Sequence, residues 1–440
     1  MADAGIHDSA SAIGCFRLRQ SRKCPMPRPQ SVPAEISPPA PARSLRAGHR
    51  DRNWFSLCAA MFVVAWGGNQ FTPLLTMYRA ERGFSELAVN TLLFAYVIGL
   101  IPSLLLAHRL AARWGTRTPL VLAVPVSALG SILVAAGSHY PALMFAGRMS
   151  TGMALGIGMV VGGLALDSLT TSPGRAPRAS AMSLTSGFAM GAGAAGALAQ
   201  WAPAPTTAAF LLHGVLCVAA ALLIARTTTN SPVRARPEPL ERNRILLPRA
   251  FHLLVIPAAP WIFGALGIAY AVLPPIVAPQ LEGFDTAFSG LLCLLSLGLG
   301  FVAQRLVGRT AGRSGPARGI GLTLFVAGTL AAAFAAATAS IWLVVVAASV
   351  LGVGYGLTLV GCLRDCERLA PPGRLGTMTG RVYCLGYLGF GLPTAIAWLH
   401  SSYAIGTPAT LLGVASAAVA ANVAGAAILR ILSRTRASRR

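Results

Sequence analysis

Twelve apolar runs separated by short basic turns constrain the fold of this chain more than any other feature of its sequence. Each run has about 20 residues, the length that crosses the hydrocarbon core of a bilayer as a helix. The composition agrees, because 55% of the residues are hydrophobic and only 11% are charged, whereas a soluble domain carries about 25% charged residues. We therefore predict an all-α integral membrane protein with twelve transmembrane helices.

The distribution of cations predicts the orientation of these helices. The runs lie at residues 54–77, 86–107, 118–138, 141–166, 179–200, 207–226, 251–278, 285–307, 318–338, 341–363, 376–399 and 407–432. If both termini are cytoplasmic, all but three of the 36 Lys and Arg residues fall on the cytoplasmic side. The exceptions are Arg79 and Arg82, on the outside, and Arg148, within a span. Cytoplasmic loops are normally the basic ones, so we expect a multi-pass protein of the cytoplasmic (inner) membrane.

Short matches between the two parts of the chain indicate an internal repeat. The second span ends Arg109-Leu-Ala-Ala-Arg113 and the eighth ends Arg305-Leu-Val-Gly-Arg309, at an offset of 196 residues. Leu155-Gly-Ile-Gly158 recurs as Leu351-Gly-Val-Gly354 at the same offset. This repetition is typical of transporters built from two repeats around a midplane site. It predicts two pseudo-symmetric six-helix halves, residues 51–226 and 251–433, joined by a basic cytoplasmic linker at 227–250.

The remaining segments and residue types mostly exclude functions. Residues 1–50 are rich in Pro, Ser and Arg, which predicts a disordered cytoplasmic tail, and residues 434–440 form a short basic tail. The eight Cys have no framework spacing, so we expect reduced thiols and no metal site. No glycine loop followed by Lys and Ser or Thr is present, so we expect no nucleotide and no other cofactor. The Arg residues do not form one basic surface, which argues against nucleic acid as a partner.

Two segments resemble motifs of the major facilitator superfamily. The loop His108-Arg-Leu-Ala-Ala-Arg113-Trp-Gly115-Thr-Arg117 is similar to that family's G-x-L-A-D-R-x-G-R-R loop, with Ala112 in place of the Asp. In the fourth span, Phe145-Ala-Gly-Arg148-Met-Ser-Thr-Gly152 resembles the family's second motif, an embedded Arg followed by a Gly. The resemblance implies a secondary transporter that works by alternating access, without enzymatic activity and as a monomer.

The same resemblance implies a set of gating residues at the cytoplasmic ends of the helices. Glu367 and Arg374 have the acidic-to-Arg spacing of the family, and Asp167 and Arg175 match it more loosely. The expected cytoplasmic gate consists of Arg113, Asp167, Arg175, Arg309, Glu367 and Arg374.

Polar residues inside the spans are candidates for solute binding or coupling. Arg148 lies inside the fourth span, where a cation costs about 2.5 kcal/mol or more at the helix centre, so it should have a partner. The alternative is that it extends to the outer interface. In the first span, Asn69 and Gln70 precede Pro73, which frees a backbone carbonyl. Either amide contacts the solute or both form structural bonds between helices.

Aromatic residues inside the spans suggest a partly apolar cavity. The candidates are Trp66, Trp261, Tyr270, Tyr355, Tyr383 and Tyr387. The alternative role for each is packing or anchoring at the interface. A lone His in a span, His213, is expected to be a packed hydrogen-bonding residue rather than a titrating one.

The spans hold no Asp or Glu near mid-depth, which disfavours proton coupling through a buried carboxylate. Coupling to protons would then involve Arg148, a His or an acid at a helix end. We expect export of a partly hydrophobic small organic solute, with protons as the candidate coupling ion and membrane lipid as a further partner. Uptake or facilitated diffusion of a nutrient is the alternative. A non-transporting membrane sensor is less favoured, and so is a membrane-embedded enzyme, which would need convergent His, Asp or Glu.

Overall fold

The computed structural model describes residues 41–138, 140–170, 172, 175–226, 247–309, 316–371 and 374–437, with side chains described except at 41–50, 308–309 and 433–437. The chain divides into two units, Met1–Arg46 and Ala47–Arg440. Of the first unit only residues 41–46 are described, and they are helical. The contacts that follow all lie within the second unit.

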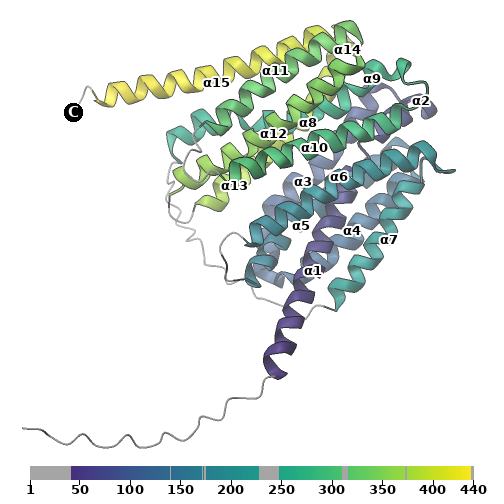
Figure 1. The fold of residues 1–440 in the computed structure, drawn as a ribbon, viewed down its shortest axis with the longest axis vertical. Helices are drawn as coiled ribbons and strands as arrows, with labels where there is room; N and C mark the ends of the chain where they lie inside the picture. The colour runs from purple at the N-terminus through teal and green to yellow at the C-terminus, as the bar shows by residue number, and fades with distance from the viewer. Residues whose placement is uncertain are drawn as a thin grey trace, which may run out of the picture. The chain divides into compact units, whose positions relative to one another are not determined.

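Every regular element in the described residues is a helix, and Figure 1 shows the helices in two groups, purple to teal and green to yellow. The first half contains α1 (Pro41–Asn69), α2 (Leu74–Arg82), α3 (Glu86–Trp114), α4 (Arg117–Ala136), α5 (Pro141–Ser168), α6 (Arg175–Trp201) and α7 (Ala208–Ala225). The second half contains α8 (Ala259–Gly267), α9 (Pro274–Val277), α10 (Asp285–Arg309), α11 (Ala317–Thr338), α12 (Ile341–Leu369), α13 (Leu375–Leu388), α14 (Leu392–Tyr403) and α15 (Thr407–Ala437).

Ten helical segments in the described part of the chain are long and apolar enough to cross a membrane. The two other predicted spans are α1 with α2, and α6. These are less apolar, because α1 ends in Gly, Gly and Asn and α6 carries two Arg and several Ser and Gly residues. The prediction of an all-helical protein with twelve spans is confirmed.

Several predicted boundaries are wrong by more than a turn. The second span was expected to end at residue 107, but α3 continues to Trp114 because basic residues prolong the helix beyond its apolar part. α1 begins at Pro41, inside the tail that composition predicts to be disordered. Residues 1–40, most of the predicted linker (227–246) and residues 438–440 lie outside the described residues.

Three spans are interrupted along their length, and each interruption lies beside Pro or Gly. Between α1 and α2, residues Gln70 to Pro73 form a turn in which Thr72 N donates to Asn69 O (3.1 Å). The seventh span (Phe251–Gln280) alternates α-helix with two π-helical turns. The eleventh span passes through a 3₁₀ turn at Gly389–Gly391, between α13 and α14. Broken helices free backbone groups, and in transporters of two repeats they mark the binding region.

Close packing of glycines repeats between the halves and corrects the register of the repeat. Gly152 and Gly156 on α5 abut the backbone of α3, and Gly352 and Gly356 on α12 abut the backbone of α10. These glycines correspond at an offset of 200 residues, about one helical turn more than the 196 of the sequence matches. Small residues recur every fourth position along such interfaces. An alignment of the two halves that is shifted by one helical turn therefore still pairs small residues with small residues.

Candidate solute site

Arg148 on α5 is anchored to the backbone of two neighbouring helices. Its side chain is only 1% exposed. Its Nε donates to the carbonyl of Leu92 on α3 (3.3 Å), and its Nη1 donates to the carbonyl of Gly68 on α1 (3.2 Å). Gly68 lies in the last turn of α1, where carbonyls lack helical partners and form the negative end of the helix dipole. The break in the first span therefore supplies an acceptor for the buried cation.

Two aromatic faces complete the surroundings of this guanidinium. Its Cζ lies 4.8 Å from the ring centroid of Phe71 and 5.0 Å from that of Tyr96, both within the range of a cation–π interaction. Its third nitrogen, Nη2, is buried without a hydrogen-bond partner among the described residues. Because the side chain is inside the protein, it does not extend along the surface to the membrane interface. Among the described residues, the groups that compensate the buried charge of Arg148 are therefore backbone carbonyls and aromatic rings, and none is a carboxylate.

The second half contributes a cluster of rings, called here the aromatic cluster and defined as Phe263, Tyr270, Tyr355, Tyr387 and Phe390. Phe263 on α8 stacks on Tyr387 with centroids 4.1 Å apart and planes at 12°. It also lies 5.6 Å from Tyr355 and 5.4 Å from Phe390. Tyr270 packs on Phe390 at 6.2 Å. Three of these residues, Tyr270, Tyr355 and Tyr387, were candidates from the sequence.

Tyr96 connects Arg148 to the aromatic cluster across the two halves. Its ring lies 6.2 Å from that of Tyr387 and 5.8 Å from that of Phe390, in edge-to-face contacts. The cation of the first half and the rings of the second half therefore form one continuous site. The sequence analysis missed Tyr96, Phe71, Phe263 and Phe390; the helix breaks beside Phe71 and Phe390 were the available signal.

The other predicted aromatic residues lie outside this cluster. Trp66 is buried on α1 and packs on Phe62, with centroids 5.7 Å apart. Trp261 packs on Phe325 at 5.3 Å, and its indole N–H is buried without a partner among the described residues. Tyr383 is partly buried on α13. Solute contact by these three residues stays a prediction.

Both predicted amides bridge helices of the first half. Asn69 Nδ2 donates to the carbonyl of Phe188 on α6 (3.0 Å), and its Oδ1 accepts from Thr72 Oγ1 (2.7 Å). Gln70 Nε2 donates to Ser131 Oγ on α4 (2.8 Å), while its Oε1 is buried without a partner in the described part of the chain. Their geometry is that of bonds between helices, and a solute contact for either one stays a prediction.

The bond from Gln70 continues into a buried network around His213 on α7. Ser131 Oγ lies 2.7 Å from His213 Nδ1, and the carbonyl of Val63 lies 3.0 Å from Nε2. A carbonyl only accepts, so Nε2 carries the proton and Nδ1 accepts from the Ser131 hydroxyl. His213 is fully buried and both ring nitrogens are occupied, as expected of a packed hydrogen-bonding His.

The predicted gating residues are not brought together as ion pairs. Arg113, Asp167 and Glu367 are exposed, and Arg374 is partly exposed. The Arg175 guanidinium lies over the ring of Trp54, 4.5 Å from its centroid. Among the described residues no salt bridge joins any two of the predicted six. Arg309 is the last residue of α10, and its side chain lies outside the described residues. Their role as a gate stays a prediction.

An ion pair that the sequence analysis did not anticipate lies at the same end of the second half. Arg318 Nε donates to Asp365 Oδ2 at 2.9 Å, joining α11 to α12. The α3–α4 turn marks the same end of the first half, and we call this end of the bundle the basic end because of Arg109, Arg113 and Arg117. The pair links helices of one half only, so it favours neither a closed nor an open arrangement of the two halves.

The halves meet closely at the end opposite to the basic end. Gln200, in the last turn of α6, donates from Nε2 to the carbonyl of Gly283 (2.8 Å), and its Oε1 accepts from the N–H of Ala287 on α10 (3.2 Å). Nearby, Gly196 and Gly290 approach so closely that a Cβ on either would contact the other's backbone. Figure 1 shows α6 and α10 side by side.

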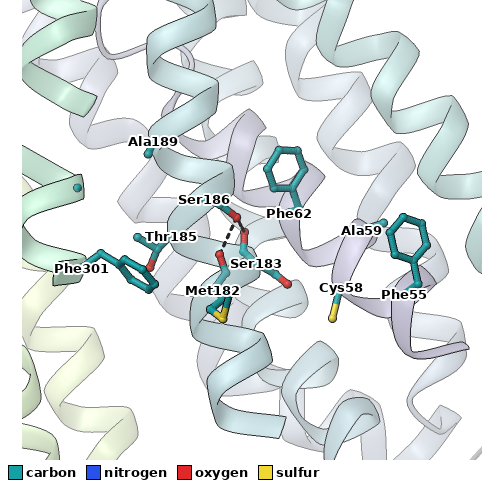
Figure 2. A pocket seen from close by; sticks show the side chains of 11 residues that line it. Phe55, Cys58, Ala59, Phe62, Met182, Ser183, Thr185, Ser186, Ala189 and Phe301 are labelled. Carbon is teal, nitrogen blue, oxygen red and sulfur yellow. Dashed lines mark hydrogen bonds between the residues drawn. The ribbon is translucent and has the colours of Figure 1, made fainter. Parts of the chain in front are cut away.

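Toward the basic end, a pocket of about 530 Å³ opens between α1, α6 and α10. Figure 2 shows the rings of Phe55, Phe62 and Phe301 and the side chain of Met182 around it. Its hydroxyl groups come from α6, where Ser186 is already bonded to the carbonyls of Met182 and Ser183. The pocket is therefore lined mainly by apolar atoms. At this end Arg305 Nη2 approaches Met182 Sδ at 3.1 Å, linking the two halves.

Comparisons with solved structures agree with this arrangement. The nucleoside transporter NupG superposes with a TM-score of 0.63 at 13% identity, covering 86% of this chain and 98% of that one. The inward-open conformation of the xylose transporter XylE from E. coli superposes with a TM-score of 0.63 at 11% identity, covering 83% and 94%. A D-xylose–proton symporter gives 0.61 at 12%, covering 83% and 96%. At these identities the likeness concerns the fold.

No curated protein sequence matches this chain. The model of one family, the Major Facilitator Superfamily, matches residues 57–394. That match extends from the first span into the eleventh and includes Arg148, the aromatic cluster and the breaks in the three spans that meet there. The chain is therefore a transport protein of the membrane that belongs to the major facilitator superfamily.

Proposed function

We propose that this protein exports a small, partly apolar organic solute across the cytoplasmic membrane by alternating access. The observation that carries the proposal is the continuous site formed by Arg148, Tyr96 and the aromatic cluster, because its two parts belong to different halves. A solute held between them is exposed to one side or the other as the halves rock. The aromatic surface suits a solute with an apolar body.

The direction of transport is inferred from the two ends of the bundle. The contacts of Gln200 join the halves at the end opposite to the basic end, while the apolar pocket lies between α1, α6 and α10 toward the basic end. If the basic end is cytoplasmic, an apolar solute is collected from the cytoplasm. Uptake of a nutrient is the second candidate, because two of the similar structures are named as transporters of xylose and of nucleosides.

Orientation is tested by labelling single cysteines in a variant that lacks the native Cys. Cys at Arg82 or Glu282 should react with an impermeant thiol reagent applied from outside, whereas Cys at Arg236 or Arg313 should not. The opposite pattern would reverse the orientation and with it the assignment of direction.

Transport is tested by comparing deletion and overproducing cells for tolerance to a chemical panel and for accumulated metabolites, followed by flux in proteoliposomes. Export predicts greater tolerance, or less accumulation, in the overproducer. Greater accumulation of a nutrient in the overproducer would establish uptake. No flux of any solute in sealed proteoliposomes would favour a sensor.

A further inference from the structure

We infer that the solute is an organic monoanion, a carboxylate on a flat apolar body, with the carboxylate on Arg148 and the body against the aromatic cluster. This inference rests on the proposed function, because it names the solute class of the same site.

The guanidinium has one nitrogen left for a ligand. Nε and Nη1 are used on the carbonyls of Leu92 and Gly68, and Nη2 is buried without a partner. A buried N–H donor that has lost its hydrogen bonds to water without gaining an acceptor costs free energy. An ionised acceptor compensates this cost best, because hydrogen bonds between charged groups are the strongest. A carboxylate oxygen fits this position, since the guanidinium group is built to bind planar oxyanions.

The charge is as important as the hydrogen bond. No Asp or Glu is buried in the described residues, so Arg148 has only carbonyl dipoles and ring faces around it. An unpaired buried charge is destabilising, and a bound anion removes the imbalance. A neutral hydroxyl or amide would satisfy Nη2 and leave the charge unpaired. The site therefore discriminates in favour of an anion.

The number of buried cations sets the number of negative charges. Among the described residues, the buried side chains that can carry a positive charge are Arg148 and His213. His213 is bonded through both ring nitrogens to Ser131 and Val63, away from the aromatic cluster. One cation therefore faces the site. A dicarboxylate would leave its second charge buried among rings, which disfavours it.

The rings define the rest of the solute. Phe263 and Tyr387 stack face to face, and Tyr96 contacts Tyr387 and Phe390 from the other half. When the halves separate here, Tyr96 loses its contacts with Tyr387 and Phe390. A flat apolar solute between them would restore ring contacts on both sides. Such ring contacts contribute about 0.5–1.5 kcal/mol each beyond buried area. A body rich in hydroxyl groups would find few acceptors there.

A binding experiment on the purified full-length protein tests the inference. The probes are phenylacetate, its neutral isostere 2-phenylacetamide, and acetate, which has the charge without the ring. Phenylacetate should bind about tenfold or more tightly than the amide, as expected for a hydrogen bond between charged groups, and acetate should bind weakly. Equal affinity for phenylacetate and the amide, or no binding of phenylacetate, would overturn the inference.

Variants locate the preference. Arg148→Gln should abolish the preference for phenylacetate over the amide, while Arg148→Lys should keep the preference with a lower affinity. Arg79→Gln is the matched control, since Arg79 is paired with Glu86 at 3.7 Å outside the site, and it should behave as the parent does. If Arg148→Gln does not fold, Arg148→Lys is the informative variant. The inference is overturned if a folded Arg148→Lys protein shows no preference for phenylacetate over the amide. It is also overturned if Arg148→Gln retains the preference.

Flux in proteoliposomes separates this inference from the proposed function. Selective binding of phenylacetate without any flux would contradict transport and leave the anion site standing. Flux of neutral solutes that is unaffected by Arg148→Gln would support transport and overturn the anion site.

Discussion

The two halves share a packing scheme and differ in chemistry at their centres. Gly152 and Gly352, at equivalent positions of α5 and α12, abut the backbones of α3 and α10, each the helix two before in the chain. At the same offset, Arg148 on α5 corresponds to Ala348 on α12, which is fully buried. The first half has a polar centre of cation, amides and His, and the second has an aromatic centre. The two halves therefore share the packing of their helices but differ in the side chains at their centres, and each half contributes a different part of the solute site.

The largest effect should follow removal of the cation from the polar half. Arg148→Ala should reduce transport by at least about 30-fold, because truncating one member of a buried charged interaction costs about 2–5 kcal/mol. Arg148→Lys should restore little, since a point charge does not reach both carbonyls and a solute. Membrane abundance, measured in parallel, should stay near that of the parent. Full transport activity of Arg148→Ala would contradict the role assigned to the cation of the first half.

The polar network around His213 should matter for stability and not for selectivity. Ser131→Ala leaves Gln70 Nε2 and His213 Nδ1 without their partner, which should destabilise the protein by about 1–3 kcal/mol. Thermal unfolding in detergent measures this change. The ratio of transport rates for different solutes should not change. A changed ratio of transport rates would mean that the network around His213 also contributes to solute selection.

Contacts between the halves should control which end is open. Gln200→Ala removes two hydrogen bonds at the end opposite to the basic end, worth about 1–2 kcal/mol together. Distances between spin labels near Glu86 and Glu282 should shift toward longer values. Thr323→Ala is the control, because Thr323 bonds within its own helix, to the carbonyl of Gly319, and should leave the distances unchanged. Unchanged distances in Gln200→Ala would mean that this contact does not hold the end closed.

Loss of one ring from the aromatic half should have a smaller effect than loss of the cation. Phe263→Ala removes a stacked partner of Tyr387 and should weaken solute affinity by about 0.5–1.5 kcal/mol, or roughly twofold to twelvefold. Trp398→Ala, in the exposed pair with Tyr403, should leave affinity as it is. A loss for Phe263→Ala as large as that for Arg148→Ala would contradict the unequal roles assigned to the halves.

The smallest effect is expected at Ala112, the position of the family's Asp in the loop after the second span. From the resemblance of this loop to the family's, we expect a carboxylate there to meet the N-terminal end of the eleventh helix when the basic end closes, a contact worth on the order of 1 kcal/mol. Ala112→Asp should shift the protein toward the state open on the outside by up to about fivefold. Identical spin-label distances in the parent and in Ala112→Asp would exclude this latch.

The sequence was informative about the membrane-spanning plan and less so about the site. Apolar runs and Arg placement depend on local composition, so they predict spans and expected orientation directly. Arg148 was recognisable because a cation in a span requires compensation. Its actual surroundings, the carbonyl of Gly68 and the ring of Tyr96, come from helices about 50 to 80 residues away. Which aromatic residues face that ring depends on helix rotation, which periodicity does not resolve in spans apolar on all sides.

The most direct test of the division between the halves is an electron cryo-microscopy structure of the protein with phenylacetate bound. The account predicts a carboxylate oxygen about 2.8 Å from Nη2 of Arg148, the distance of a charge-assisted hydrogen bond, with the ring between Tyr96 and the aromatic cluster. Phenylacetate bound only in the pocket lined by Phe55, Met182 and Phe301, with Nη2 of Arg148 still unpaired, would contradict it.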